Sequence, residues 1–368
     1  MKRLYCLFII ILCLAISIPS YAQFTINGKH IIYDKQNDTY MACIPEDAFG
    51  KDYEAIILLD IASDWSDLSI DGTQIAYSYT FKQVEGNKLY SIHARKGNKE
   101  INTKITFTFL PLLVLQGSFG YDYAQGSMSL YSSDATEPTI SLIKAKWRGG
   151  STNTADKHKR NYKIKSINFK GKSQDISLLG MREDNNWIMD AGQIDLFRLR
   201  NRIATEIWND FATKPYYASK EPKVKSGVTG KVVEVILNNE YRGIYSLTEA
   251  MDRKELKLKK YDDKNQEFHG QLWKVSSWDK ATFWDIDKDY DNTQETWHAF
   301  ETKYPDIEDV NPTDYSPLYE AIDFVVNSND EAFKKEAGDY FDIPVLIDYQ
   351  LFLETLKPVD NNGKNMYW

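Results

Sequence analysis

Cysteine is scarce in this sequence. Only three cysteines occur in 368 residues, and two of them, Cys6 and Cys13, lie in an apolar stretch at the N-terminus. That leaves Cys43 alone in the rest of the chain, whereas a disulfide framework needs cysteines in pairs. We therefore expect ordinary hydrophobic cores to hold the protein together, with Cys43 as a small buried residue and not a nucleophile.

An excess of positive charge is also absent. The chain has 45 Lys and Arg against 53 Asp and Glu, which gives a formal net charge of −8 at pH 7. Binding to nucleic acid depends on a basic surface that attracts phosphates. We therefore predict no nucleic-acid partner.

Long apolar runs are missing except at the N-terminus. There an apolar run extends over residues 4–18, follows Lys2 and Arg3, and precedes a small-residue pattern that ends at Ala22. A membrane span needs about 20 apolar residues, and this shorter run has the layout of a secretory signal. We predict a signal peptide over residues 1–22, no stable membrane span, and secretion to the periplasm or cell surface.

The motifs of several common enzyme classes are absent as well. The sequence has no Gly-x-Ser-x-Gly, no His-Glu-x-x-His and no Walker loop, and its five histidines show no metal-ligand spacing. The acidic stretch "DIDKDYDN" (285–292) alternates carboxylates as a calcium loop does. Tyr290, however, stands where an EF-hand requires glycine, and Thr296 stands where its glutamate belongs. A solvated acidic loop is the expectation here.

Short strand-like segments fill the first part of the chain. "HIIYD", "EAIILLDI" and "TKITFTFLPLLVL" are bounded by Gly, Asn or Asp, which is typical of strands between turns. We predict an antiparallel, sandwich-like β domain over residues 24–120. The stretch 120–138 is rich in Gly, Ser and Tyr and has no helical period, so we place the domain boundary there.

Strands and helices alternate in the second part, residues 138–368. Apolar residues recur at helical spacing over 194–211, and "KVVEVILNNEYRGIYSLTE" has the pattern of a β-hairpin. Helix-start signals follow at Ser316-Pro317 and at Asp342 with Pro344. The predicted fold class is therefore α+β, with a ligand cleft expected between a sheet-rich and a helix-rich lobe.

The stretch "DNNGKN" is the strongest candidate for chemistry. Asp360 and Asn365 lie five residues apart, after an apolar helix and before "NMYW". A protein-kinase catalytic loop has the same interval, because its Asp is directed at the substrate hydroxyl while its Asn reaches the metal bound to the nucleotide. By itself this stretch would also make an ordinary turn.

Several motifs in the same order extend this similarity. "KWRGGST", "KRNYKIK", "NWIMDAGQIDLFRLRN", "VVEVILNNEYRGIYSLTE", "FDIPVLIDYQLF" and "DNNGKN" together resemble the CotH kinase family of atypical, secreted or spore-coat protein kinases. One departure is Gly150, which occupies the Asn place of the family's Arg-Gly-Asn-Ser loop. The resemblance begins after the predicted β domain and runs to the end of the chain.

The resemblance implies a two-lobed, atypical kinase-like domain that transfers the γ-phosphoryl group of ATP, with Mg²⁺ or Mn²⁺, to a protein substrate or to itself. The family's roles fall on positions that match its motifs. Asp360 and Lys165 would be catalytic, Asn365 would bind metal, and the nucleotide would be held by Arg148, Lys163, Lys165 and Glu249. For the two lysines an exposed strand face remains the alternative, and for Arg148 a solvated turn. For Asp195, at the helix start, a helix cap and an ion-pair role inside the cleft both remain open.

The family pattern continues past the asparagine of this loop into an Asp-rich segment, which the given sequence does not include. We therefore expect a kinase domain that is incomplete at its C-terminus and weak or inactive. The main alternative is a non-catalytic binding protein of the periplasm or cell surface that contacts a glycan or a protein partner through its aromatic side chains, 14% of the sequence. A glycoside hydrolase would need two carboxylates about 5 to 9.5 Å apart. The acceptor, the metal, the ligand of the β domain and the oligomeric state stay open.

Overall fold

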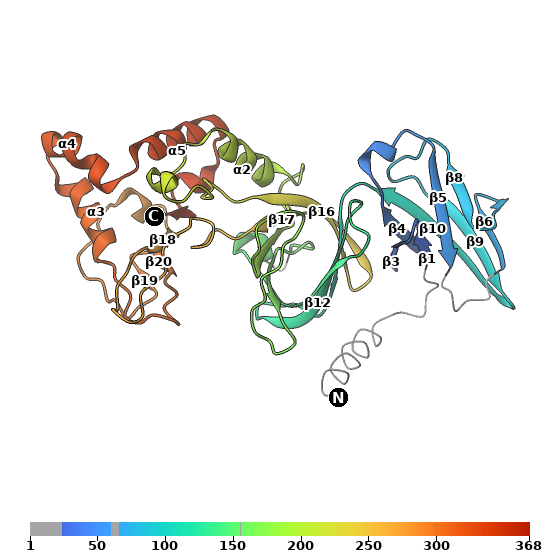
Figure 1. Ribbon diagram of the computed structural model, residues 1–368. Coiled ribbons are helices and arrows are strands. Elements are labelled where there is room, and N and C mark those ends of the chain that lie inside the picture. The colour runs from blue at the N-terminus through green and yellow to red at the C-terminus, as the bar shows by residue number, and fades with distance from the viewer. Residues whose placement is uncertain (1–23, 60–65, 155) are drawn as a thin grey trace. The chain divides into compact units, whose positions relative to one another are not determined.

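The structure is a computed structural model that describes residues 24–59, 66–154 and 156–368 (Figure 1). The predicted signal peptide lies outside these residues. Contacts between residues divide the chain into unit 1 (Met1–Asn185 with Val232–Tyr245) and unit 2 (Asn186–Lys231 with Ser246–Trp368). Within the described part, no helix has both the length and the apolar composition needed to cross a membrane.

Two sheets at the start of unit 1 share one hydrophobic core. Ile26, Ala55 and Phe81 belong to one sheet and Tyr40 and Phe107 to the other, and all five are buried in the same cluster. The first sheet has the order β2-β1-β5-β8, with β1 (Phe24–Ile26), β2 (Lys29–His30), β5 (Tyr53–Leu59) and β8 (Ser78–Phe81). The second has the order β3-β4-β10-β9-β6-β7, with β3 (Ile32–Asp34), β4 (Thr39–Cys43), β6 (Ser66–Ile70), β7 (Thr73–Gln74), β9 (Tyr90–Lys96) and β10 (Lys99–Thr108). The prediction of a β-structured N-terminal part is confirmed.

The named strands of this part are antiparallel, as predicted, with the exception of one pair. β4 and β10 pair in parallel, with Thr39 opposite Lys104 and Cys43 opposite Thr108. Parallel neighbours need a long connection, and here the chain between β4 and β10 contains β5 to β9. The sequence pattern of each strand is the same for either direction, so it could not reveal this pairing.

Strands after β10 form a different sheet. β11 (Leu112–Gln116), β12 (Ala124–Tyr131), β13 (Thr139–Trp147), β14 (Tyr162–Ile167), β15 (Asn186–Asp190), β16 (Gly230–Leu237) and β17 (Glu240–Glu249) form a closed barrel of order β11-β12-β13-β14-β15-β17-β16. β11 and β16 are parallel, and β11 to β14 are antiparallel neighbours. Side chains buried on one face of these strands include Leu113, Met128, Ile143 and Ile164.

The stretch "TKITFTFLPLLVL", which we predict as one strand, is two strands in two sheets. The break falls at 109–111, where Pro111 has no N–H to donate to a sheet. The Gly-, Ser- and Tyr-rich stretch 120–138, where we place the domain boundary, contains β12. The domain limits 24–120 and 138–368 themselves stay a prediction.

Unit 2 contains the α-helices of the described residues and a small sheet. The helices are α2 (Arg200–Phe211), α3 (Ser316–Asn327), α4 (Asp330–Tyr340) and α5 (Ile343–Leu356), and Figure 1 shows α3 to α5 in orange and red. The sheet has the order β19-β20-β18-β21, with β18 (Leu272–Val275), β19 (Thr296–Trp297), β20 (Phe300–Tyr304) and β21 (Met366–Tyr367). Val275, Phe300 and Tyr315 are fully buried in a core that also includes α3.

The helix predicted over 194–211 is shorter than expected. It begins at Arg200, because Arg198 has a positive φ of 62° that interrupts the helical backbone. Asp195 precedes the helix, accepts a hydrogen bond from the backbone N–H of Arg200 at 2.8 Å, and pairs with the Arg200 side chain at 3.3 Å. These are local contacts beside the helix start, and the ion pair that Asp195 would form inside the cleft stays a prediction. The described residues combine several largely antiparallel sheets with α2 to α5, and the two-lobed kinase arrangement stays a prediction.

Candidate functional site

The loop that carries Asp360 and Asn365 connects α5 to β21. α5 ends at Leu356, and Lys357 takes a left-handed conformation (φ 49°) that turns the chain away from the helix axis. The next residues form the short 3-10 helix η5 (Val359–Asn362). The backbone N–H of Lys364 donates to the carbonyl of Asp360 at 2.8 Å, so the loop closes on itself.

Three contacts from elsewhere in unit 2 fix this loop. The hydroxyl of Tyr349 in α5 donates to the carbonyl of Asn361 at 2.6 Å, and burial raises the pKa of Tyr349 to about 12, which keeps the phenol protonated. The backbone N–H of Asn365 donates to the carbonyl of Val275 in β18 at 2.9 Å. The indole of Trp278 covers Gly363 so closely that a Cβ at this position would lie 2.3 Å from its Cε3 atom.

The side chains of Asp360 and Asn365 are exposed. The Asp360 side chain is 59% exposed and lies 3.3 Å from the ammonium group of Lys364. Asn365 is exposed at a positive φ of 59°, a conformation that Asn tolerates better than most residues. Beside the loop is a shallow pocket of about 230 Å³, lined by Trp278, Leu353, Glu354, Lys357, Pro358, Val359 and Asn362. An anchored backbone therefore presents a carboxylate and an amide to solvent.

These two side chains supply hard oxygen donors of the kind that Mg²⁺ prefers. Magnesium usually keeps several waters and takes one or two protein ligands plus substrate phosphates. Across the described residues, no group of three His, Cys, Asp or Glu side chains is arranged to hold a metal ion by itself. The donor set fits a metal that arrives with a phosphate ligand better than a permanently bound structural metal.

Lys163 and Lys165 lie on one face of β14. Their neighbours Tyr162 and Ile164 are buried on the other face, as the alternation predicts. Both lysines are partly buried, and the choice between a cleft-side face and an exposed strand face stays a prediction. The Lys165 ammonium lies 5.1 Å from the centre of the Tyr123 ring.

Sequence reasoning missed two further lysines on the same face. In the antiparallel register of β13 and β14, Lys144 lies opposite Lys165 and Lys146 lies opposite Lys163. The signal was present in "TISLIKAKW", where lysines alternate with the buried Ile143 and Ala145. Only the pairing register, which depends on the fold, places the four lysines together.

Arg148 follows β13 and begins the loop "RGGST". Its side chain is exposed, and its backbone is held by Asn161, whose carbonyl accepts its N–H at 3.1 Å, and by Asn153, which donates to its carbonyl at 2.6 Å. Gly149 has a positive φ of 93°, and a Cβ there would lie 2.3 Å from the Thr152 hydroxyl. A Cβ at Gly150 would meet nothing within 4 Å, so the loop leaves space for a side chain at that place.

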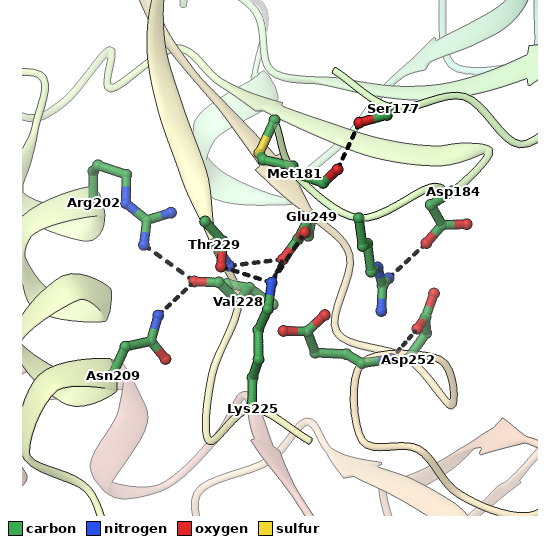
Figure 2. A network of polar contacts seen from close by, with 12 residues as sticks. Ser177, Met181, Asp184, Arg202, Asn209, Lys225, Val228, Thr229, Glu249 and Asp252 are labelled. Carbon is green, nitrogen blue, oxygen red and sulfur yellow. Dashed lines mark hydrogen bonds and ion pairs between the residues drawn. The ribbon is translucent and has the colours of Figure 1, made fainter. Parts of the chain in front are cut away.

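Glu249, at the end of β17, is buried in a polar network of unit 2 (Figure 2). Its carboxylate accepts from the Lys225 ammonium at 2.9 Å and from the backbone N–H of Thr229 at 3.0 Å. The Lys225 ammonium also donates to the Thr229 hydroxyl at 2.9 Å. The carboxylate thus fixes the segment before β16, and the predicted contact of Glu249 with a nucleotide stays a prediction.

Arg202 of α2 belongs to the same network and was also missed. Its side chain is 4% exposed, donates to the carbonyl of Val228 at 3.1 Å and pairs with Glu206 at 3.2 Å. Burial lowers the pKa of Arg202, while the charges of Glu206 and Glu249 oppose that shift. A Cβ at Gly230 would lie 2.2 Å from its guanidinium, so glycine leaves the space that Arg202 occupies. Figure 2 shows Arg202 and Asn209 directed at the same carbonyl.

The predicted site residues therefore fall into two sets. Arg148, Lys163 and Lys165 belong to unit 1, and the two lysines share a strand face. Glu249, Asp360 and Asn365 belong to unit 2, and the last two share one loop.

A comparison with known protein families covers both sets of residues with one match. A family model described as CotH kinase protein matches residues 145–368, which include every predicted site residue from Arg148 to Asn365. No curated protein matches the chain. The match covers more than half of the sequence.

Proposed function

The chain belongs to the CotH kinase protein family, and on this premise we propose that it transfers the γ-phosphoryl group of ATP to a protein hydroxyl, on another protein or on itself. The observation that carries the proposal is the family match, which spans the lysine face of β14 and the anchored Asp360–Asn365 loop. The predicted signal peptide places this reaction in the periplasm or at the cell surface.

Asp360 would act on the acceptor. Its exposed carboxylate can accept a hydrogen bond from an incoming hydroxyl and take the proton as the new phosphoester bond forms. The loop contacts with Tyr349, Val275 and Trp278 support this role, because a general base must be held in place. Lys364, 3.3 Å away, pairs with the carboxylate in the absence of an acceptor.

The nucleotide would be held through its phosphates. The ammonium groups of Lys163 and Lys165 are suitable phosphate partners, and Arg148 stands on a glycine-containing loop that can approach them. Asn365 would bind Mg²⁺ or Mn²⁺, and that metal would supply charge neutralisation of the phosphate oxygens. Catalysis of this kind consists mostly of positioning and charge stabilisation.

Nucleotide binding tests the proposal directly. With Mg-ATP at 100 times its dissociation constant, a site present only in the folded protein should raise the free energy of unfolding by about 2.7 kcal/mol. We expect Lys165→Ala to remove most of this effect and Lys163→Ala to remove less, since Lys165 matches the last lysine of the family strand. Lys170→Ala, an exposed lysine in the turn after β14, is the matched control and should leave the shift unchanged.

The opposite outcome favours the alternative function. A protein whose unfolding temperature ignores Mg-ATP and Mn-ATP but rises with a glycan would be a binding protein and not a kinase. Equal shifts in the parent, Lys163→Ala and Lys165→Ala would remove these lysines from the nucleotide site.

A further inference from the structure

The shallow pocket beside the Asp360 loop has mostly apolar walls, and we call it the Trp278 pocket. Its volume is about 230 Å³, and its apolar lining comes from Trp278, Leu353, Pro358 and Val359. Sites that enclose a whole small-molecule ligand usually measure about 300–1,000 Å³. The Trp278 pocket is smaller than these sites, so its size suits one side chain of a larger partner.

The 3-10 helix η5 places this pocket next to Asp360. Val359 and Asn362, three residues apart in η5, both line the pocket. Residues at this spacing project in the same direction, because three residues complete one turn of a 3-10 helix. Asp360 follows Val359 directly and projects from η5 about a third of a turn away. The exposed Asp360 carboxylate therefore stands beside the pocket, and Asp360 is not one of the lining residues.

The apolar walls of the pocket are in contact with water. Val359 is 72% exposed and Trp278 is 43% exposed, whereas Leu353 is buried. The indole of Trp278 also lies against Gly363, so this wall of the pocket and the Asp360 loop are packed on each other. An apolar side chain that covered these walls would remove apolar surface from water, which is favourable.

The charged residues of the lining neutralise each other. The Lys357 ammonium donates to the Glu354 carboxylate at 2.5 Å, and both residues line the pocket. The pocket therefore has no formal net charge to attract a charged side chain. Such a side chain would also lose water at the apolar walls without gaining a new partner, which is costly. An apolar occupant is thus favoured over a charged one.

We propose that the Trp278 pocket determines acceptor specificity by binding a large apolar side chain, such as leucine, within two residues of the accepting hydroxyl. The inference rests on the proposed function, which brings an acceptor hydroxyl to Asp360. An extended polypeptide spans about 3.3–3.6 Å per residue, so such a side chain lies within about 7 Å of the accepting residue along the chain. The pocket begins at Val359, the immediate neighbour of Asp360. Trp278 and Val359 would contact the acceptor without taking part in the chemical step.

Photo-cross-linking tests the pocket without any need for catalysis. The full chain is irradiated with a synthetic alanine-based peptide that has a central serine and a photoreactive leucine analogue two residues from it. Mass spectrometry then identifies the attached residues, and we expect Trp278, Pro358 or Val359. Leu196 and Phe197, which are exposed apolar residues of the same unit, serve as internal controls. Attachment at these two residues as often as in the pocket, or no attachment in the pocket, would overturn the inference.

Competition against this cross-link measures the preference for an apolar side chain. Peptides with leucine at the photoreactive position should compete about tenfold better than those with alanine, aspartate or lysine there. Leucine placed four residues from the serine should compete no better than alanine. Equal competition by the leucine and alanine peptides would refute the pocket. Displacement by maltose as effective as by the leucine peptide would assign the pocket to a glycan and would also refute it.

Val359→Ser tests the wall of the pocket, with Val326→Ser, at an exposed valine in α3, as the matched control. Val359→Ser should reduce the leucine-over-alanine preference by about threefold or more, because it removes apolar contact area. Val326→Ser should keep the preference of the parent. An unaltered preference in Val359→Ser would contradict the assignment, since a general loss of folding would weaken both peptides equally.

Phosphate transfer to the same serine peptides separates this inference from the proposed function. Where label is transferred from ATP, replacing the leucine of the peptide with alanine should raise KM about tenfold and leave kcat nearly unchanged, because the pocket binds ground and transition states alike. Transfer with equal kcat/KM for the two peptides would uphold the kinase proposal and refute the pocket. Cross-linking in the pocket with the leucine preference, but no transfer with Mg²⁺ or Mn²⁺, would uphold the pocket as a peptide-binding site and refute the kinase proposal.

Discussion

Replacing Gly363 with alanine perturbs the Asp360 loop at the point where it is most tightly packed. The added Cβ would lie 2.3 Å from Cε3 and 2.4 Å from Cδ2 of Trp278, distances that no real Cβ contact reaches. Either the indole or the loop must move. Overpacking of this kind costs about 1–3 kcal/mol, and we expect about 1–2 kcal/mol because Trp278 is 43% exposed and can swing toward solvent.

The functional effect should exceed the effect on stability. Displacement of a catalytic group by about 1 Å can cost about 100-fold in rate, so we expect Gly363→Ala to lower phosphoryl transfer by about that factor. Urea unfolding measures the free energy, and incorporation of labelled phosphate measures the rate. Gly338→Ala is the matched control: a Cβ there meets nothing within 4 Å inside α4, so this change should stabilise by about 0.5–1 kcal/mol.

A double-mutant cycle identifies the cause. Trp278→Ala removes the obstacle, so Gly363→Ala should cost much less in that background, with a coupling energy of about 1 kcal/mol. If Gly363→Ala destabilises the parent and the Trp278→Ala variant equally, or if it leaves both stability and transfer unchanged, then the packing of Trp278 does not position the loop.

Three further predictions concern charge in the two units. Glu249→Gln should lower the free energy of unfolding by about 1–3 kcal/mol in urea titrations, because it disrupts a buried, charge-assisted network. The loss is limited because Lys225, the partner of Glu249, can still reach water. Glu100→Gln, in an exposed ion pair, should change the free energy of unfolding by less than about 0.5 kcal/mol. Burial raises the pKa of Glu234 above its ordinary 4.5, so this carboxyl stays protonated to a higher pH in the folded protein than in the unfolded chain. The free energy of unfolding should therefore fall as the pH rises from about 4.5 through the raised pKa. Unfolding of Glu234→Gln across that window should lack this part of the decline, and an unchanged slope would contradict the assignment. Lys144→Gln, which removes the charge opposite Lys165, should raise stability by about 0.2–1 kcal/mol at low salt and by less at high salt, and a loss of stability at low salt would show that the pair is not repulsive.

Local sequence patterns predict the strands and helices themselves better than they predict which strands pair with each other. Alternation in "RNYKIKSINF" correctly places Lys163 and Lys165 on one face of a strand, because side-chain direction in a strand depends on local geometry alone. The parallel pairing of β4 with β10 depends on contacts between distant segments and could not be predicted. The helix predicted over 194–211 begins only at Arg200, because the positive φ of Arg198 interrupts the helical backbone despite the apolar spacing.

The same distinction applies to the site. The interval between Asp360 and Asn365 is local, so the sequence indicates the loop directly. Trp278 and Tyr349, which fix that loop, come from other segments and have no recognisable spacing relative to it. Lys225, the partner of Glu249, is likewise found only when the chain is folded.

Phosphoryl transfer through Asp360 is tested most directly by the transfer of label from γ-labelled ATP with Mg²⁺ or Mn²⁺ present. Weak labelling of the chain itself or of an added protein acceptor is expected. Asp360→Asn should abolish that labelling while still binding Mg-ATP, and Asp339→Asn, at an exposed position in α4, should label as the parent does. Labelling that persists unchanged in Asp360→Asn, or a parent protein that binds nucleotide but never transfers label, would contradict the account.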